Sequence, residues 1–283
     1  MKQVDDNHRT LAASRSAGRG SRYWVRAAIV TSVLATIGLV GGFVYGTYTA
    51  LYGSGGKATA EGSAQTSSGS TPVAAGNRKT VHLVALGDSL THGFGDVSGR
   101  GYVGDVSQYY RSAGKQVIQS NLGIDGLTSD GLQKELQQTS VQHVIGSADV
   151  VLVSIGGNDL NDSAGLPQLD ATRIAKAEAN FTANLTSILA EIRRLNPSAS
   201  VVLVGLYNPY GTVVATASQT NAIVQTWDLR EDLVAAKLPG VIVVQTFDLF
   251  QLHPSQFLYL DHFHPNQAGY QRIADRIWQD LQG

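Results

Sequence analysis

From residue 80 to the C-terminus, short apolar runs alternate with longer stretches of helical spacing. The apolar runs, rich in Val, Ile and Leu, are residues 81–86, 117–121, 150–155, 201–206 and 241–246. Apolar residues recur at helical spacing over residues 103–113, 131–138, 173–195, 220–236 and 267–281. Continuous apolar strands are typical of a parallel sheet that is covered on both faces. The alternation therefore predicts a doubly wound three-layer α/β/α sandwich around a five-stranded parallel sheet.

Upstream of this predicted domain lies a long run without charge. Residues 27–52 contain no Asp, Glu, Lys or Arg and exceed the ~20 residues that a membrane-spanning helix needs. Because six Lys and Arg residues precede the run against two Asp, the positive-inside rule predicts a cytoplasmic N-terminus and an extracellular domain. The run is longer than the apolar core of a signal peptide, so we expect an uncleaved single-pass anchor. Release by cleavage near residues 58–60 is the alternative.

Between the predicted anchor and the domain, the chain is dominated by small residues. Residues 53–77 are mostly Gly, Ser, Ala and Thr without periodicity, a composition typical of a flexible tether. The predicted organisation is a basic cytoplasmic head, a transmembrane anchor, a linker and one folded domain, over residues 1–26, 27–52, 53–79 and 80–283.

Composition excludes several kinds of function for the domain. The chain has no Cys, so disulfides, thiolate metal sites and a cysteine nucleophile are ruled out. From residue 80 onward, 12 Lys and Arg residues stand against 19 Asp and Glu residues. This mildly acidic balance, without a basic patch that includes aromatic residues, argues against nucleic acid as a partner.

In a doubly wound fold the chemistry lies at the carboxyl ends of the strands, and the first apolar run ends in Gly-Asp-Ser-Leu. Ser89 can therefore project its hydroxyl at the edge of the sheet as a nucleophile. An N-terminal helix cap is the alternative role for this serine. The stretch is neither a G-x-S-x-G elbow nor a phosphate-binding loop, because the glycine spacing and the lysine are missing.

Two further strand ends offer hydrogen-bond donors. Gly123 follows the second apolar run and can present its backbone N–H at close range. Asn158 follows a Gly-Gly turn after the third run, and its amide is a good donor to a developing oxyanion. An ordinary turn at Gly123 and an Asx turn at Asn158 are the structural alternatives.

The segment before the last helical stretch reads Asp-His-Phe-His-Pro-Asn. Asp261 and His264 are three residues apart, so their side chains fall on the same side of a single turn. Asp261 can then accept a hydrogen bond from one imidazole nitrogen and leave the other free to face Ser89. His262 is expected to point elsewhere. A metal site built from this segment is disfavoured because no second ligand cluster is obvious, and no cofactor is expected.

Together these segments supply a nucleophile, donors for an oxyanion hole, and a base with an orienting carboxylate. The sequence at this point resembles the SGNH (GDSL) hydrolase family in four separated blocks. The blocks are Gly87-Asp88-Ser89-Leu90, Gly123, Gly157-Asn158-Asp159 and Asp261-x-x-His264. The resemblance runs from about residue 81 to the C-terminus. It is strongest to the lipase/acylhydrolase branch that Gram-positive bacteria secrete or anchor in the membrane, to which the stretches 93–96 and 206–210 are similar.

This resemblance implies a flavodoxin-like sheet and two-step ester hydrolysis through an acyl-serine intermediate, without a metal. Ser89 would be the nucleophile and His264 the general base, with Asp261 orienting the imidazole. The backbone N–H groups of Ser89 and Gly123 and the side chain of Asn158 would form the oxyanion hole.

Apolar and aromatic residues near the strand ends are the candidates for binding an acyl chain: Phe94, Leu160, Tyr207 and Tyr210. We therefore expect a serine esterase that acts on lipid-type or short-chain acyl esters close to a membrane. The alternatives are a deacetylase of cell-wall or exopolysaccharide sugars, an acyltransferase that uses the same site, and a non-catalytic binding module on the same fold. The sequence leaves the physiological substrate, the acyl length and the oligomeric state open.

Overall fold

A computed structural model of the chain describes residues 78–282, apart from 166–167, 212 and 214. The predicted head, the predicted anchor and all but the last two residues of the predicted linker lie outside this part of the chain. Among the residues described, no helix is both long enough and apolar enough to cross a bilayer. The anchor over residues 27–52 therefore stays a prediction from the sequence.

The strands form one parallel sheet. In chain order they are β1 (Thr80–Gly87), β2 (Gln116–Gly123), β3 (Val150–Ser154), β4 (Ser200–Val204) and β5 (Val241–Val244). Their order across the sheet is β2-β1-β3-β4-β5, and every neighbouring pair is parallel. This is a doubly wound order that reverses direction between β1 and β3. The predicted five-stranded parallel sheet is confirmed.

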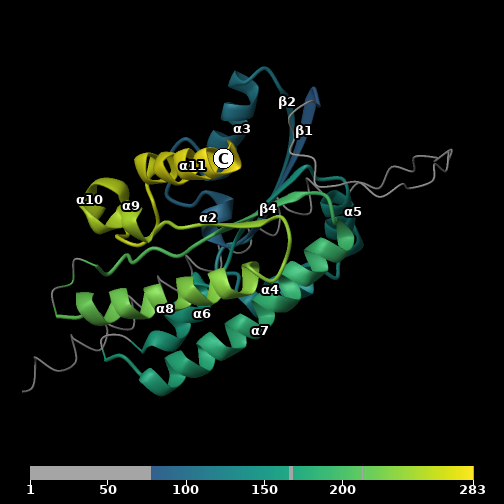
Figure 1. Cartoon of the computed structure of the whole chain (residues 1–283). Coiled ribbons are helices and arrows are strands. Elements are labelled where there is room, and N and C mark those ends of the chain that lie inside the picture. The colour runs from purple at the N-terminus through teal and green to yellow at the C-terminus, as the bar shows by residue number, and fades with distance from the viewer. Residues whose placement is uncertain (1–77, 166–167, 212, 214, 283) are drawn as a thin grey trace, which may run out of the picture. The chain divides into compact units, whose positions relative to one another are not determined.

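One face of the sheet is covered by α3 (Gly101–Ser112), α9 (Phe247–Gln251) and α11 (Gln267–Gln282). These helices lie together in the upper part of Figure 1. They bury Tyr102, Phe250 and Tyr270 against the apolar side chains of the strands. Large aromatic side chains therefore fill much of this half of the core.

The other face is covered by α4 (Ser129–Glu135), α5 (Thr139–Gly146), α7 (Ala171–Leu195) and α8 (Ala217–Ala235). The long helices α7 and α8 cross the lower part of Figure 1. Phe181 of α7 and Trp227 of α8 are fully buried, and their rings stack with centroids 4.8 Å apart. With both faces covered, the predicted three-layer arrangement is confirmed for this part of the chain.

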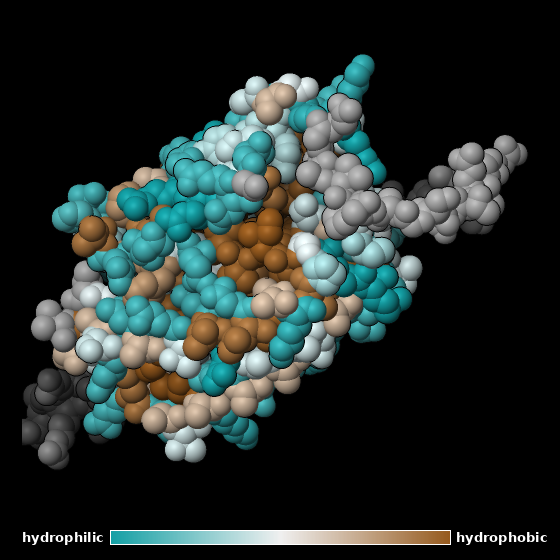
Figure 2. All heavy atoms as spheres, viewed as in Figure 1, coloured by the Kyte–Doolittle hydropathy of each residue, from teal (hydrophilic) through white to brown (hydrophobic). Residues whose placement is uncertain are grey.

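The two edge strands are less buried than the sequence predicts. In β2, side chains are exposed or half-buried throughout, and Ile118 is 52% exposed. In β5, only Val244 is fully buried. Figure 2 shows apolar residues in a hollow on the side of the molecule that faces the viewer. In Figure 1, the sheet lies in this region, between α11 and α8. The strands β1, β3 and β4 are buried over most or all of their length, because they have neighbours on both sides, whereas an edge strand has a neighbour on one side only.

Two short helices begin close to the carboxyl ends of strands: α2 (Ser89–His92) after β1 and α6 (Gly157–Ala164) after β3. A third short helix, α10 (Pro254–Phe257), follows α9. The apolar repeat did not predict them, because a helix of one or two turns contains too few residues to show a period. They position the groups described next.

Candidate active site

The nucleophile candidate, Ser89, is the first residue of α2 and lies at the carboxyl end of β1. Asp88 caps this helix from an extended conformation, and its Oδ1 accepts a hydrogen bond from the Leu90 N–H at 3.0 Å. Gly87 has φ = +136°, and a Cβ on it would lie 2.0 Å from the carbonyl oxygen of Ser154. Only glycine fits this turn, which directs the serine to the edge of the sheet.

The base candidate approaches Ser89 from the opposite end of the chain. His264 Nε2 lies 2.8 Å from Ser89 Oγ, and His264 Nδ1 lies 2.7 Å from Asp261 Oδ2. The other oxygen of Asp261 accepts the backbone N–H groups of Phe263 and His264 at 2.9 and 3.0 Å. The Ser–His–Asp chain of hydrogen bonds predicted from the sequence is therefore present in the structure.

Asp261 is held in its charged form by its own turn. Its partial burial works in the other direction, but hydrogen bonds from the His264 side chain and from two backbone N–H groups keep the pKa of this carboxyl below its usual range. A carboxylate that stays ionised fixes the proton on Nδ1 of the imidazole and leaves Nε2 able to accept one.

His262 takes no part in this chain of hydrogen bonds. It is exposed and sits in the left-handed region with φ = 57°. Within the described residues, no group of three or more His, Asp or Glu side chains is arranged to hold a metal ion. The prediction that His264, and not His262, faces Ser89 agrees with the geometry.

The two predicted oxyanion donors lie at the same edge of the sheet and are already hydrogen-bonded. Gly123 pairs with Gly87 in the β1–β2 register, and its N–H donates to Asn121 Oδ1 at 3.0 Å. A Cβ on Gly123 would lie 2.3 Å from the backbone nitrogen of His92, so a larger residue cannot occupy this position. Asn158 Nδ2 donates to the Leu127 carbonyl at 2.8 Å and keeps a second hydrogen for another acceptor.

Asp159, next to the Asn158 donor, has a structural role. Its carboxylate accepts hydrogen bonds from the N–H and the hydroxyl of Ser129, at 2.9 and 2.5 Å. These bonds tie α6 to the start of α4. They fix the position of α6, which carries Asn158 into the lining of the same pocket as Ser89.

A buried polar network beneath Ser89 was not predicted from the sequence. Ser154 Oγ donates to Asp88 Oδ1 at 2.7 Å, and Thr91 Oγ1 lies 2.7 Å from Ser154 Oγ and 2.6 Å from the Tyr102 hydroxyl. All four side chains are buried. Burial raises the pKa of Asp88 to about 6, although hydrogen bonds from Ser154 and Leu90 oppose the rise. A polar residue at the end of an apolar run, as at Ser154, is the one signal that points to such a network.

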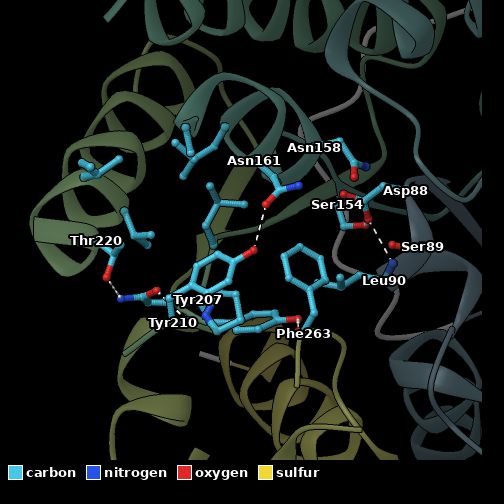
Figure 3. Close-up of a pocket in the computed structure, with 18 of the residues that line it drawn as sticks. Asp88, Ser89, Leu90, Ser154, Asn158, Asn161, Tyr207, Tyr210, Thr220 and Phe263 are labelled. Carbon is cyan, nitrogen blue, oxygen red and sulfur yellow. Dashed lines mark hydrogen bonds between the residues drawn. The ribbon is translucent and has the colours of Figure 1, made fainter. Parts of the chain in front are cut away.

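A pocket that opens to solvent begins at Ser89. Its lining is predominantly apolar and comes from α6, β4, α8 and the loops that follow β4 and precede α11. Figure 3 shows Ser89 and Leu90 at one side of the pocket and Thr220 at the other. Such a lining suits a hydrocarbon group attached to an ester that reacts at Ser89.

Three of the four predicted acyl-binding residues line this pocket. They are Leu160, Tyr207 and Tyr210. Tyr207 is held by a hydrogen bond from its hydroxyl to the Phe263 carbonyl at 2.6 Å. Phe94 is not among the lining residues; its ring lies against His264 with centroids 4.5 Å apart, and 42% of the residue is exposed. Phe94 therefore neighbours the base and not the pocket.

Sequence comparison connects this arrangement to known proteins. Residues 85–272 match the model of the GDSL-like Lipase/Acylhydrolase family. An uncharacterized Bacillus subtilis protein, YpmR, is 35% identical over 210 residues, which cover 72% of this chain and 82% of that protein. The spore germination lipase LipC of Bacillus licheniformis is 24% identical over 208 residues, 70% of this chain and 95% of LipC.

Solved structures share the fold. The lipase Lip_vut3 from a goat rumen metagenome matches with a TM-score of 0.64 and 21% identity, over 71% of this chain and 97% of the lipase. A mutant of Axe2, an acetyl-xylooligosaccharide esterase from Geobacillus, matches with a TM-score of 0.56 and 21% identity, over 72% of this chain and 94% of the esterase. At these identities the likeness is one of fold.

Proposed function

The chain belongs to the GDSL-like lipase/acylhydrolase family and is a hydrolase of that family; on this premise we propose that it cleaves carboxylic esters whose acyl group is apolar. The pocket that begins at Ser89 is the observation that carries the proposal, because its lining is almost free of polar surface. A sugar or a charged acyl group would leave its polar groups without partners there, whereas a hydrocarbon chain would not.

In the proposed reaction, Ser89 Oγ attacks the ester carbonyl carbon while His264 Nε2, at 2.8 Å, takes the hydroxyl proton. The charge that develops on the carbonyl oxygen is stabilised by the N–H groups of Ser89 and Gly123 and by Asn158. The imidazolium then gives its proton to the leaving alcohol, and the acyl group stays on Ser89. A water molecule, deprotonated by His264, releases the acid and regenerates the serine.

Asp261 stabilises the imidazolium that forms in both steps. Its Oδ2 accepts from Nδ1, and the backbone N–H groups on Oδ1 prevent the carboxylate from turning away. The oxyanion donors reach the new charge in different ways. Asn158 uses its second hydrogen, while the Gly123 N–H shares or exchanges its bond to Asn121 Oδ1.

A test of this proposal uses p-nitrophenyl esters of increasing acyl length with the full-length chain, Ser89→Ala, and Ser187→Ala on the exposed face of α7 as the matched control. We expect activity that persists from acetate to octanoate and longer esters. We expect Ser89→Ala to lower kcat by about 10³-fold or more. Ser187→Ala is expected to keep the kcat of the wild type. His262→Ala is expected to retain activity and His264→Ala to lose it.

Other outcomes would redirect the proposal. Hydrolysis limited to the acetate ester would favour the deacetylase alternative. Transfer of the acyl group to an added sugar or alcohol in preference to water would favour an acyltransferase. A folded chain that hydrolyses none of the esters would favour a binding module.

The uncharged run over residues 27–52, with the arginines before it, supports a membrane-anchored enzyme whose domain faces the cell exterior. In that location the substrate is a lipid-type ester within reach of the tether. We expect protease added to intact cells to digest the domain and to leave a cytoplasmic protein intact. Protection of the domain under those conditions would reverse the proposed orientation.

A further inference from the structure

A hydrogen bond joins two residues that line the apolar pocket. The Tyr210 hydroxyl donates to Asn161 Oδ1 at 2.9 Å, and both residues line the pocket. Tyr210 comes from the connection between β4 and α8, and Asn161 comes from α6. In Figure 3 this bond lies between Ser89 on one side and Thr220 on the other. This contact between side chains links two elements that are far apart in the sequence.

The lining also includes Ile223 and Val224 of α8, together with Leu169. In Figure 3, Thr220 of the same helix lies on the side of the bond away from Ser89. A short acyl group attached at Ser89 needs only the near part, which Leu90 helps to line. In this arrangement, a long chain that starts at Ser89 and extends toward the apolar lining of α8 runs beside Tyr210 and Asn161.

The backbone of Tyr210 is held by a hydrogen bond to Asn208, whereas its hydroxyl is hydrogen-bonded to Asn161. The Tyr210 N–H donates to Asn208 Oδ1 at 3.0 Å, and Asn208 Nδ2 donates to Thr220 Oγ1 and Asn221 Oδ1 at 2.9 and 2.6 Å. Asn208 therefore fixes the loop to α8. Because Asn161 is exposed and Tyr210 half-buried, the ring can turn once this one hydroxyl bond is broken, without loss of the bonds that hold its backbone.

Tyr210 also contacts the segment that carries the base. Its ring lies next to that of Phe263, with centroids 6.2 Å apart, and the Phe263 ring packs edge-on to His264 at 5.0 Å. An acyl chain that displaces Tyr210 therefore moves a ring that neighbours the catalytic turn.

We propose that the Tyr210–Asn161 hydrogen bond is a gate that sets the acyl-chain preference of this enzyme. With the bond closed, the part of the pocket next to Ser89 accepts short and medium chains. With the bond open, long chains reach the lining of α8. This inference rests on the proposed esterase function and adds to it the two residues that decide which acyl lengths are used.

The gate is tested with the full-length chain by measuring kcat and KM on p-nitrophenyl acetate and p-nitrophenyl dodecanoate. Tyr210→Phe removes the hydrogen bond and keeps the ring. Tyr110→Phe, which removes a hydroxyl from the opposite face of the sheet, is the matched control. Loss of one neutral hydrogen bond shifts an equilibrium by about three- to tenfold, so we expect the dodecanoate-to-acetate ratio of kcat/KM to rise by that factor, mainly through a lower KM for the long ester.

Asn161→Ala and the double variant complete the test. Each single variant is expected to raise the ratio, and the double variant is expected to match Tyr210→Phe, because both changes remove the same bond. An unchanged ratio in variants that fold and hydrolyse acetate, or strictly additive effects, would overturn the gate and leave the esterase function intact. Inactivity of the wild type on every ester would overturn both.

Discussion

The two halves of the proposed catalytic centre are built in opposite ways. The half that holds Ser89 is buried: Asp88 is 4% exposed, and its carboxylate belongs to a network with Ser154 that reaches into the core. The half that holds His264 is a surface turn, in which the side chain of Asp261 remains 33% exposed. The first half depends on strands and helices that meet in three dimensions. The second is completed by bonds between residues two and three positions apart.

The carboxylates of the two halves respond to this difference with pKa shifts of opposite sign. Burial raises the pKa of Asp88 to about 6, whereas hydrogen bonds from the catalytic turn outweigh partial burial and lower the pKa of Asp261. A raised carboxyl pKa means that Asp88 contributes stability below about pH 4 and loses it as the pH rises to about 6. A lowered pKa means that Asp261 contributes stability above about pH 4 and loses it as the pH falls through its folded-state value.

The comparison shows that one half of the site fixes the position of the nucleophile and the other supplies the negative charge beside the base. The buried half gives Ser89 a fixed position at the cost of a carboxylate that is hard to ionise. The exposed half supplies a permanent negative charge with little demand on the core. Single substitutions can therefore change one half while leaving the other in place.

The largest effect is expected from Asp261→Ala, which removes the charge of the exposed half. Without the carboxylate, neither the tautomer of His264 nor its cationic form is stabilised, so kcat should fall by about 10³- to 10⁴-fold. The melting temperature at pH 7 should fall only modestly: the stability contributed by the ionised carboxylate is lost, but the turn lies outside the core. Ester hydrolysis and thermal melts measure the two effects. A large loss of stability with modest loss of kcat would mean that the turn is structural and not catalytic.

An intermediate effect is expected from Asp88→Asn in the buried half. The amide oxygen can still accept from Ser154 and Leu90, but the charge that attracts the His264 imidazolium is gone. We expect kcat at pH 8 to fall by roughly tenfold. We also expect the variant to gain melting temperature relative to the wild type between pH 4 and about 6, because it no longer has a buried carboxyl to ionise.

The pH dependence is measured as the difference in melting temperature between Asp88→Asn and the wild type at each pH. Burial also raises the pKa of Asp228, to about 7, and that of Glu231, so both proteins keep a common decline in stability at higher pH. Identical melting curves of the two proteins across pH 4 to 8 would contradict the assignment of this pH window to Asp88.

The smallest effect on catalysis is expected from Thr91→Val, which preserves shape and removes a hydroxyl from the buried network. Thr91 Oγ1 donates to the Leu86 carbonyl and contacts Ser154 and Tyr102, so the loss leaves buried groups without partners. Such a loss lowers the free energy of unfolding by about 1–3 kcal/mol. We expect kcat to fall less than tenfold. Thr186→Val, on the exposed side of α7, is the matched control, and equal losses in both variants would argue against a special role of the network.

The same contrast explains which parts of the site could be predicted. Asp261 and His264 are three residues apart, so a rule about one turn sufficed to assign them. Ser89, Gly123 and Asn158 were found because polar residues and glycines follow apolar runs, and parallel strands bring their carboxyl ends to one edge. The network of Ser154 with Asp88 and Tyr102 had no comparable local pattern, since its members lie on separate elements.

The acyl pocket shows the same limit. Phe94 was expected to bind the acyl chain because it is an aromatic residue near a strand end, but it is not among the residues that line the pocket, and its ring packs against His264. Asn161 and Phe263 were not expected to line the pocket, yet they contact Tyr210 from elements about 50 residues away in either direction. Side chains that meet across loops leave no periodicity in the sequence.

By itself, the sequence determined the five strands, the helices α3, α4, α7, α8 and α11, and the order in which the nucleophile, the oxyanion donors and the base occur. These follow from periodicity and from spacing within a turn, which act over a few neighbouring residues. Only the tertiary structure decided that Asp88 is buried enough to raise its pKa, that Phe94 lies beside the base, and that Tyr210 reaches Asn161 across the pocket. Burial and contacts between distant elements arise from packing in three dimensions, which a local pattern does not encode.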